Sequence, residues 1–209
     1  MHKSVVVLVG LLALAAGYFM SNAGTATHSV SLNKQTDSAI FVYPQARPLP
    51  AVDLIDMQGK EITEKAFRDS WWMLYFGFTH CPDACPMALA NMQQIKARLP
   101  ENSNIRFALI SVDPQRDSPD TLREYVTHFD QDFYAATGSK EQLDLLTAGL
   151  HVVYVIDPDA AQEQDYNVDH SNFMVLINPA GQHAGIISAP HIPDTISTEL
   201  QSLLTSADS

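Results

Sequence analysis

Cysteine is scarce in this chain of 209 residues, which has only two, Cys81 and Cys85. Two cysteines are too few for the disulfide-dense scaffolds of small secreted proteins. A bridge between them would also close too short a loop to stabilise the fold much. The pair is therefore a poor candidate for a purely structural disulfide, and two interpretations stay open, a redox dithiol and a metal site.

Basic residues are scarce as well. The chain has 12 Lys and Arg against 24 Asp and Glu, a formal net charge of −12, and no basic patch interrupts it. A nucleic-acid backbone would find no complementary charge here, so we expect no nucleic-acid partner. Internal repeats are also absent, while the 46% hydrophobic content is enough for the core of one globular domain.

The N-terminal segment predicts a membrane connection. Lys3 precedes an uncharged apolar run over residues 5–20, slightly short for a span of about 20 residues and slightly long for a secretory core of about 7–15. Residues 1–20 are therefore predicted to be a signal-anchor, or else a cleaved signal peptide. Residues 21–40 predict a flexible tether. The positive-inside rule then places the domain, residues 41–206, on the periplasmic or extracytoplasmic side of the inner (plasma) membrane.

Strand and helix signals alternate through the predicted domain. The apolar run at 71–76 is typical of a strand buried on both faces, and Pro86 fits the first turn of a helix that ends near Leu99. The other predicted elements are a hairpin around the turn 56–60, a strand at 105–113, a helix opened by Ser118 and Pro119, a helix with a capping box from Ser139 to Gln142 and a C-cap at Gly149, antiparallel strands at 173–177 and 184–188, and a helix capped by Asp194 that ends near Leu204. This order predicts a thioredoxin-like α/β fold, a central mixed sheet flanked by helices.

The cysteine pair lies where the first buried strand meets its helix. Residues at i and i+4 share one helix face, so Cys81 and Cys85 can meet in a disulfide or share a metal ion. Helix N-terminal amides favour a thiolate, which predicts lowered thiol pKa values. Two thiolates are soft ligands that select copper(I) or zinc, but two ligands leave the site open. A third donor is therefore expected.

His170 is the best candidate for that donor among the eight histidines. It directly precedes a buried strand, and in a thioredoxin-like sheet the loop before that strand packs against the cysteine loop. His80 is adjacent to Cys81, but its side chain is expected to point away. Soft thioether ligands are also available, yet the spacing of these methionines favours core packing over copper transfer. They are Met87, Met92 and Met174.

Three segments in combination resemble the Sco family, also called SenC. They are "YFGFTHCPDACP", "ISVDPQRDSPDTLREYV" and "YNVDHSNFMVLINPAG". The resemblance implies a membrane-tethered, thioredoxin-like protein that binds copper and helps to assemble cytochrome c oxidase. Carried over by position, the copper ligands fall on Cys81, Cys85 and His170. Asp83 and Asp169 also match motif positions; we assign them no ligand role and expect Asp83 to cap the helix.

The resemblance favours a copper chaperone without enzymatic activity. Such a protein would take copper, as Cu(I) or Cu(II), from a periplasmic donor and deliver it to the copper A centre in subunit II of cytochrome c oxidase. One alternative is a thiol-disulfide oxidoreductase that reduces the cysteines of that centre, with Cys81 attacking and Cys85 resolving. Against it, thioredoxin-type reductases use C-x-x-C and a cis-proline where this chain has Asp169, His170 and Ser171. A copper or redox sensor is a further alternative.

Overall fold

The computed structural model describes residues 38–156 and 166–207. The predicted signal-anchor or signal peptide, and the tether up to residue 37, lie outside the described residues. The first described strand begins at Ile40. Among the helices of the described part, none is both long enough and apolar enough to cross a bilayer.

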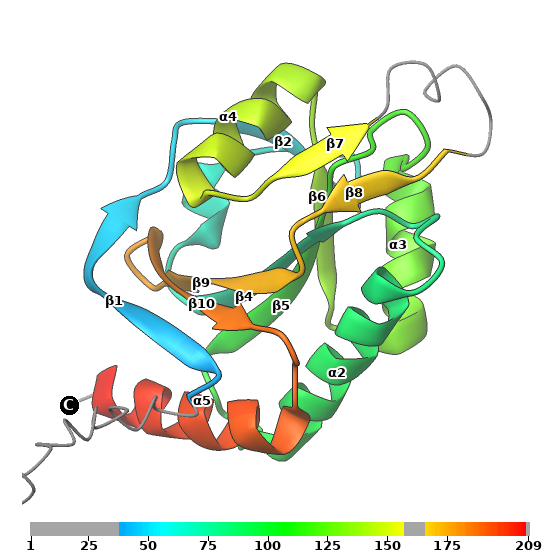
Figure 1. Cartoon of the computed structure of the whole chain (residues 1–209). Helices are drawn as coiled ribbons and strands as arrows, with labels where there is room; N and C mark the ends of the chain where they lie inside the picture. Colours follow the sequence, from blue (N-terminus) through cyan, green and yellow to red (C-terminus); the bar gives the residue numbers. More distant parts are fainter. Residues whose placement is uncertain (1–37, 157–165, 208–209) are drawn as a thin grey trace, which may run out of the picture. The chain divides into compact units, whose positions relative to one another are not determined.

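A mixed sheet of eight strands forms the centre of the domain (Figure 1). Its strands, in spatial order, are β1 (Ile40–Pro48), β10 (Gln182–Ser188), β9 (Phe173–Asn178), β4 (Trp71–Gly77), β5 (Ile105–Ser111), β6 (Tyr134–Thr137), β2 (Asp53–Asp56) and β3 (Glu61–Thr63). β4, β5 and β6 are parallel to one another, and the other neighbours pair antiparallel. The mixed central sheet predicted from the sequence is confirmed.

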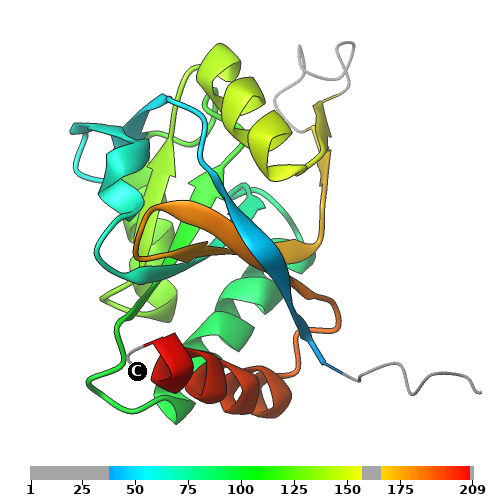
Figure 2. The same cartoon turned by 90° about the vertical axis from the view of Figure 1, so that its left-hand side faces the viewer.

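Helices cover the sheet on both sides. They are α2 (Ala84–Arg98), α3 (Pro119–Phe129), α4 (Lys140–Leu150) and α5 (Pro193–Ala207). In both views α4 lies above strands β4, β9 and β10, whereas α2 and α5 lie below them (Figures 1 and 2). α2 contacts both α3 and α5. Strand β4 is consequently enclosed from both faces, and all seven of its residues are buried, as its apolar run predicted.

One helix start agrees with the sequence prediction and two helix boundaries differ from it. α2 begins at Ala84, so Pro86 lies in its first turn as predicted, and Cys85 belongs to the helix. α4 continues through Gly149 and ends on His151, whose φ of 57° is left-handed; a Cβ at Gly149 would lie 2.9 Å from the Pro50 ring. Close packing, and not a left-handed turn, therefore requires glycine there. Asp194 lies within the first turn of α5 and does not cap it.

Four strands were not predicted. β1 and β6 complete the sheet, and β7 (Tyr154–Ile156) pairs with β8 (Val168–His170) as a separate two-stranded ribbon. β1 shows no apolar alternation, because its residues are mostly exposed at the sheet edge. β7 and β8 are three residues each, below the length at which alternation identifies a strand. The ribbon ends in His170, one of the three residues that the sequence singled out as candidate ligands.

Candidate metal centre

The cysteine loop joins the carboxyl end of β4 to α2. Cys81 lies before the helix and is partly exposed, and its Sγ accepts a hydrogen bond from the backbone N–H of Cys85 at 3.4 Å. The sulfur thus satisfies one of the free amides of the first helical turn. Asp83 occupies the N-cap position, yet its side chain makes no capping hydrogen bond. The prediction that Asp83 caps the helix through its carboxylate is wrong, because the cysteine sulfur fills that place.

Cys85 is fully buried beneath this loop. A Cβ added at Gly77, the last residue of β4, would lie 2.5 Å from the Cys85 Sγ. The absence of a side chain at Gly77 therefore creates the space that the sulfur fills. Both cysteines are free thiols, one partly exposed and one enclosed.

His170 reaches the cysteines from the end of β8. Its Nδ1 lies 3.1 Å from the carbonyl oxygen of Ser171, an arrangement in which Nδ1–H donates and Nε2 keeps its lone pair. Nε2 lies 3.4 Å from the Cys85 Sγ. The imidazole stands edge-on to the rings of Tyr75 and Phe78, with centroid distances of 5.8 and 6.0 Å. These contacts hold the ring with its free nitrogen toward the sulfurs.

One sulfur from each cysteine and one nitrogen from His170 lie within 4.8 Å of one another. The structure thus brings together the three residues that the sequence singled out, although 85 positions separate Cys85 from His170. Sulfur and imidazole donors in this number suit copper or zinc better than a hard cation. The cluster is enclosed on the Cys85 side and reachable from the Cys81 side.

Burial sets the protonation of the centre. It raises the pKa of the Cys85 thiol, with hydrogen bonding and charge from Cys81 adding to the effect. The expected lowering by the helix N-terminus is therefore wrong for Cys85, because loss of solvent outweighs the helix amides. Burial also lowers the pKa of His170, so its imidazole is neutral at pH 7. Near neutral pH, the Cys85 S–H can donate to His170 Nε2.

Other residues singled out from the sequence have different places. His80 contacts Thr79 and Asp117, away from the sulfurs, as expected from its position beside Cys81. Met92 and Met174 are buried in the core, as predicted. Met87 is 58% exposed, so the core prediction is wrong for this residue.

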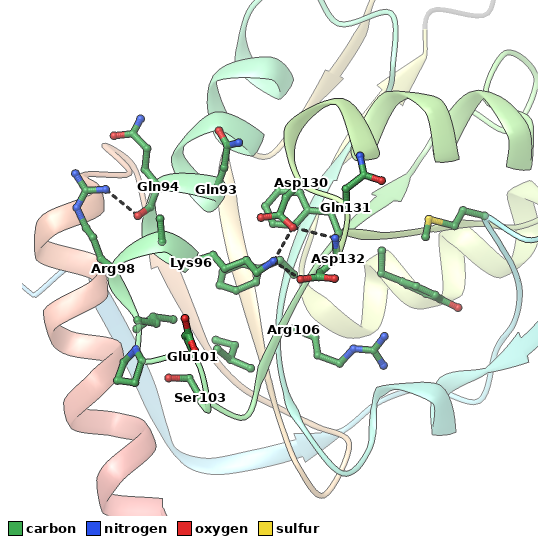
Figure 3. A pocket seen from close by; sticks show the side chains of 18 of the residues that line it. Gln93, Gln94, Lys96, Arg98, Glu101, Ser103, Arg106, Asp130, Gln131 and Asp132 are labelled. Atoms are coloured by element: carbon green, nitrogen blue, oxygen red, sulfur yellow. Dashed lines mark hydrogen bonds and ion pairs between the residues drawn. The ribbon is translucent and has the colours of Figure 1, made fainter.

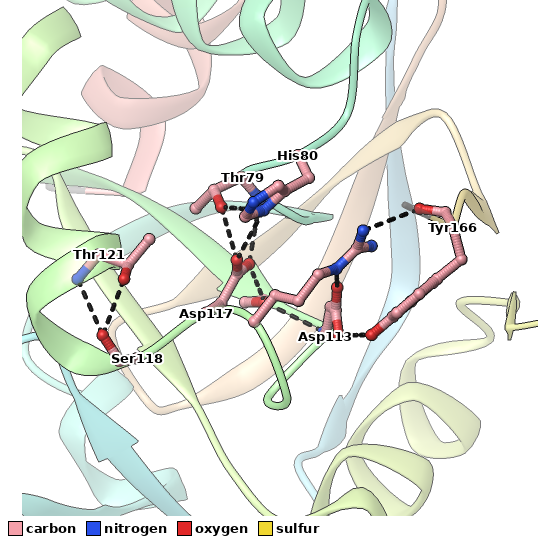
Figure 4. Close-up of polar contacts among 9 residues, drawn as sticks. Thr79, His80, Asp113, Asp117, Ser118, Thr121 and Tyr166 are labelled. Atoms are coloured by element: carbon pink, nitrogen blue, oxygen red, sulfur yellow. Dashed lines mark hydrogen bonds and ion pairs between the residues drawn. The ribbon is translucent and has the colours of Figure 1, made fainter. Parts of the chain in front are cut away.

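A polar network beside the centre was missed in the sequence (Figure 4). It contains two fully buried carboxylates, Asp113 and Asp117, which bind Arg116 of their own loop and side chains from two distant segments. The segment "SVDPQRDS" could have indicated this network, because it places three charged residues directly after a buried strand. The role of these charges could not be predicted, because their partners Thr79 and Tyr166 lie far away in the sequence.

A broad hollow of about 1230 Å³ lies near the amino end of β5, where Ile105 and Arg106 contribute to its wall (Figure 3). Lys96 crosses it to Asp130 and Asp132, at 2.5 and 2.7 Å. Among the described residues that line it there is neither cysteine nor histidine. The hollow therefore offers neither the thiols nor the imidazole of the candidate metal centre and is separate from it.

Comparison with known proteins identifies the family. The model of the family described as SCO1/SenC matches residues 45–205. The chain belongs to the SCO1/SenC family. The resemblance inferred from the three sequence segments is confirmed, and the Sco match includes the cysteine loop and the histidine ribbon.

Relatives within the Sco family differ in length. A protein of Stutzerimonas stutzeri, provisionally named as copper-binding, is 33% identical over 167 residues, which cover 79% of this chain and 81% of that protein. Mitochondrial SCO2 of Saccharomyces cerevisiae is 38% identical over 132 residues, 62% of this chain and 44% of the yeast protein. The chain thus spans less than half of that yeast relative.

Solved Sco structures share the fold. Arabidopsis thaliana ScoI with copper bound is 33% identical with a TM-score of 0.66, covering 73% of this chain and 94% of that one. Yeast Sco1 with copper bound is 30% identical with a TM-score of 0.71, covering 77% and 90%. Both relatives hold copper in their crystal structures.

Proposed function

We propose that this protein is a copper-binding assembly factor that delivers copper to the copper A centre of cytochrome c oxidase subunit II. The observation that carries the proposal is the convergence of Cys81, Cys85 and His170 donors within 4.8 Å. Two sulfurs and one imidazole suit Cu(I) and also accept Cu(II). Copper in the Arabidopsis and yeast relatives supports the same cargo here.

The protonation of the centre determines how copper would enter. His170 offers a neutral nitrogen without losing a proton. The Cys85 thiol, whose pKa is raised, must release its proton before its sulfur can bind a metal. Affinity should therefore rise with pH. The partly exposed Cys81 gives copper and a partner's ligands a point of access, and a site with few ligands favours exchange from donor to acceptor.

The proposal extends to the place of action. The apolar segment at residues 5–20 supports attachment to the inner (plasma) membrane, with the domain on the periplasmic side. A periplasmic donor would then supply the copper, and subunit II would receive it on the same side. Fractionation of cells that produce the full chain, with protease added to spheroplasts, tests this placement: the domain should be membrane-bound and cleaved from outside.

An anaerobic Cu(I) titration tests the binding. The reduced protein is titrated against a competing chelator, alongside Cys81→Ala, His170→Ala and the control His128→Ala, an exposed histidine on α3. We expect one tight equivalent for the wild type and the control, and weaker binding for the two site variants, most of all Cys81→Ala. Binding that ignores His170 would contradict the proposed centre.

A thiol-disulfide oxidoreductase is the second candidate. The observation that favours it is the asymmetry of the pair, in which Cys81 is accessible and Cys85 is enclosed beside it. A transfer assay separates the two functions. The copper-loaded protein is mixed with the reduced copper A domain of subunit II, and the copper-free dithiol with the oxidised domain. Delivery predicts copper movement in the first mixture; rapid reduction in the second, without copper transfer in the first, would favour the reductase.

A further inference from the structure

Residues 112–118, called here the β5–α3 loop, carry two carboxylates that are fully buried, Asp113 and Asp117. Ser111 links them: its Oγ accepts the Asp113 N–H at 3.1 Å and donates to Asp117 Oδ2 at 2.6 Å. Buried carboxylates are costly unless donors surround them. Thr79, in the cysteine loop, donates to Asp117, whereas Tyr166, in the segment that leads into β8, donates to Asp113 (Figure 4).

Asp117 binds the first residues of the cysteine loop. Thr79 donates twice to this carboxylate, from its backbone N–H at 3.0 Å and from its hydroxyl at 2.6 Å. Thr79 stands two residues before Cys81, where the chain leaves β4. Hydrogen bonds to a charged acceptor are stronger than neutral ones. The start of the cysteine loop is thereby fixed to the β5–α3 loop.

Asp113 and Arg116 bind Tyr166, in the segment that leads to His170. The Tyr166 hydroxyl donates to Asp113 Oδ1 at 2.6 Å, and Arg116 Nε donates to Asp113 Oδ2 at 2.6 Å. Arg116 Nη1 donates to the Tyr166 carbonyl at 2.9 Å, and its guanidinium lies 3.5 Å from the centre of the Tyr166 ring. Tyr166 leads into β8 and stands four residues before His170. The start of the ribbon is thus fixed to the same loop.

The two segments also meet at Phe78. The Arg116 guanidinium lies 5.4 Å from the centre of the Phe78 ring, and the His170 ring lies 6.0 Å from it edge-on. Phe78 precedes Thr79, and its carbonyl oxygen accepts the Cys81 N–H at 3.4 Å. A displacement of Arg116 would therefore shift Phe78, and with it the Cys81 sulfur and the His170 imidazole.

We propose that Arg116 and Asp117 are positioning residues of the metal centre, which set His170 and the cysteine loop at binding distance from each other. The inference rests on the proposed copper function. The planar guanidinium makes one fork to Asp113 and Tyr166 and stacks on an aromatic ring, which no other side chain reproduces. Residues that orient metal ligands typically change metal affinity by about 10–100-fold when replaced.

Cu(I) affinity is the first measurement. Arg116→Gln and Asp117→Asn are each expected to weaken binding by about 10-fold or more. The matched control is Arg123→Gln, which breaks the other Asp–Arg pair with i,i+3 spacing, the exposed Asp120–Arg123 pair on α3. The control should keep wild-type affinity. If the folded site variants also keep it, the inference is overturned.

Two milder variants test the inference even if Arg116→Gln or Asp117→Asn fails to fold. Tyr166→Phe removes only the hydroxyl that binds Asp113, and Thr79→Val removes only the hydroxyl that binds Asp117. Both keep the shape of the side chain. We expect smaller losses of affinity in the same direction, with the backbone bond from Thr79 retained. Arg116→Lys should fail to restore the affinity lost in Arg116→Gln, because an ammonium cannot form the fork.

Copper-free measurements separate this inference from the proposed function. Imidazole ¹⁵N NMR reports the tautomer of His170, and the rate of alkylation by iodoacetamide reports access to Cys81. Arg116→Gln should convert the single Nδ1–H tautomer into an average, and Asp117→Asn should change the alkylation rate several-fold. If both signals stay at wild-type values while only the melting temperature falls, the two residues are merely structural. If the wild type binds no copper but both signals move, the copper function fails and the positioning role stands.

Discussion

Gly77 illustrates how one missing side chain makes room for a buried sulfur, that of Cys85. Its Cα faces the Cys85 sulfur, and an added Cβ would stand 2.5 Å from that atom. Gly77→Ala should therefore displace Cys85, lower the stability of the domain by about 1–3 kcal/mol and weaken copper binding. Chemical unfolding measures the first effect and chelator competition the second.

The double variant with Cys85→Ala provides the control for Gly77. Removing the sulfur removes the overlap, so Gly77→Ala should cost much less stability in the Cys85→Ala background than in the wild type. An equal loss of stability in both backgrounds would show that the requirement for glycine at position 77 does not come from the Cys85 sulfur.

His183 lies away from the metal centre, and its burial should make the stability of the domain depend on pH. It is only 1% exposed on β10, and its ring packs edge-on against Tyr43. Burial lowers its pKa to about 4, against about 6.5 in the unfolded chain. Between those values the unfolded state binds a proton that the folded state does not. Stability should therefore fall as the pH drops from 6.5 to 4, by a total of about 3 kcal/mol from this group.

The measurement for His183 is denaturant unfolding at a series of pH values. His183→Phe keeps a ring against Tyr43 and should make the fall in stability between pH 6.5 and 4 less steep than in the wild type. His128→Phe, at an exposed position of α3, should leave the slope as in the wild type. A wild-type slope in the His183 variant would assign the acid sensitivity to other groups.

At the scale of elements, the β7–β8 ribbon is the least supported part of the centre. Its strands pair only with each other. Ser171 closes it, since its Oγ accepts the Val153 N–H at 2.9 Å and its own N–H donates to the Val153 carbonyl at 2.9 Å. Ser171→Ala should lower the local stability of the ribbon by about 1 kcal/mol. Hydrogen exchange of the ribbon amides should accelerate about fivefold at that cost.

The comparison for this element is Ser202→Ala on α5, where the hydroxyl donates to the Thr198 carbonyl on an exposed surface. That variant should leave exchange in the ribbon unchanged. Unchanged exchange in Ser171→Ala as well would mean that the side chain contributes nothing to closing the ribbon.

At the scale of the whole molecule, Glu199 connects the two ends of the described domain. From α5 its carboxylate accepts hydrogen bonds from the backbone N–H groups of Ala39 and Ile40 at 3.1 and 2.9 Å, and from the Ser38 hydroxyl at 2.9 Å. Glu199→Ala should loosen the start of β1 and cost about 1–3 kcal/mol of stability. Limited proteolysis should then cut near residue 40 faster than in the wild type. Glu124→Ala, at an exposed position of α3, serves as the control and should change neither quantity.

Elements were predictable from the sequence where one local pattern sufficed. The apolar run of β4 and the Ser118 and Ser139 caps of α3 and α4 identified their elements directly. Pro86 identified the first turn of α2 correctly, because proline is tolerated there. β1 was not predicted because its partner β10 lies far along the chain and pairing makes it a strand. The ribbon strands were not predicted because they are only three residues long.

The sequence by itself determined the family, the mixed α/β fold and the three candidate ligands, because residue identity and motif order are local properties of the chain. Only the tertiary structure decided that burial keeps the Cys85 thiol protonated, that Gly77 makes space for its sulfur, and that Asp117 and Arg116 reach both sides of the centre. The physical reason is that solvent exclusion and side-chain contact depend on which distant segments pack together. No single stretch of sequence contains that information.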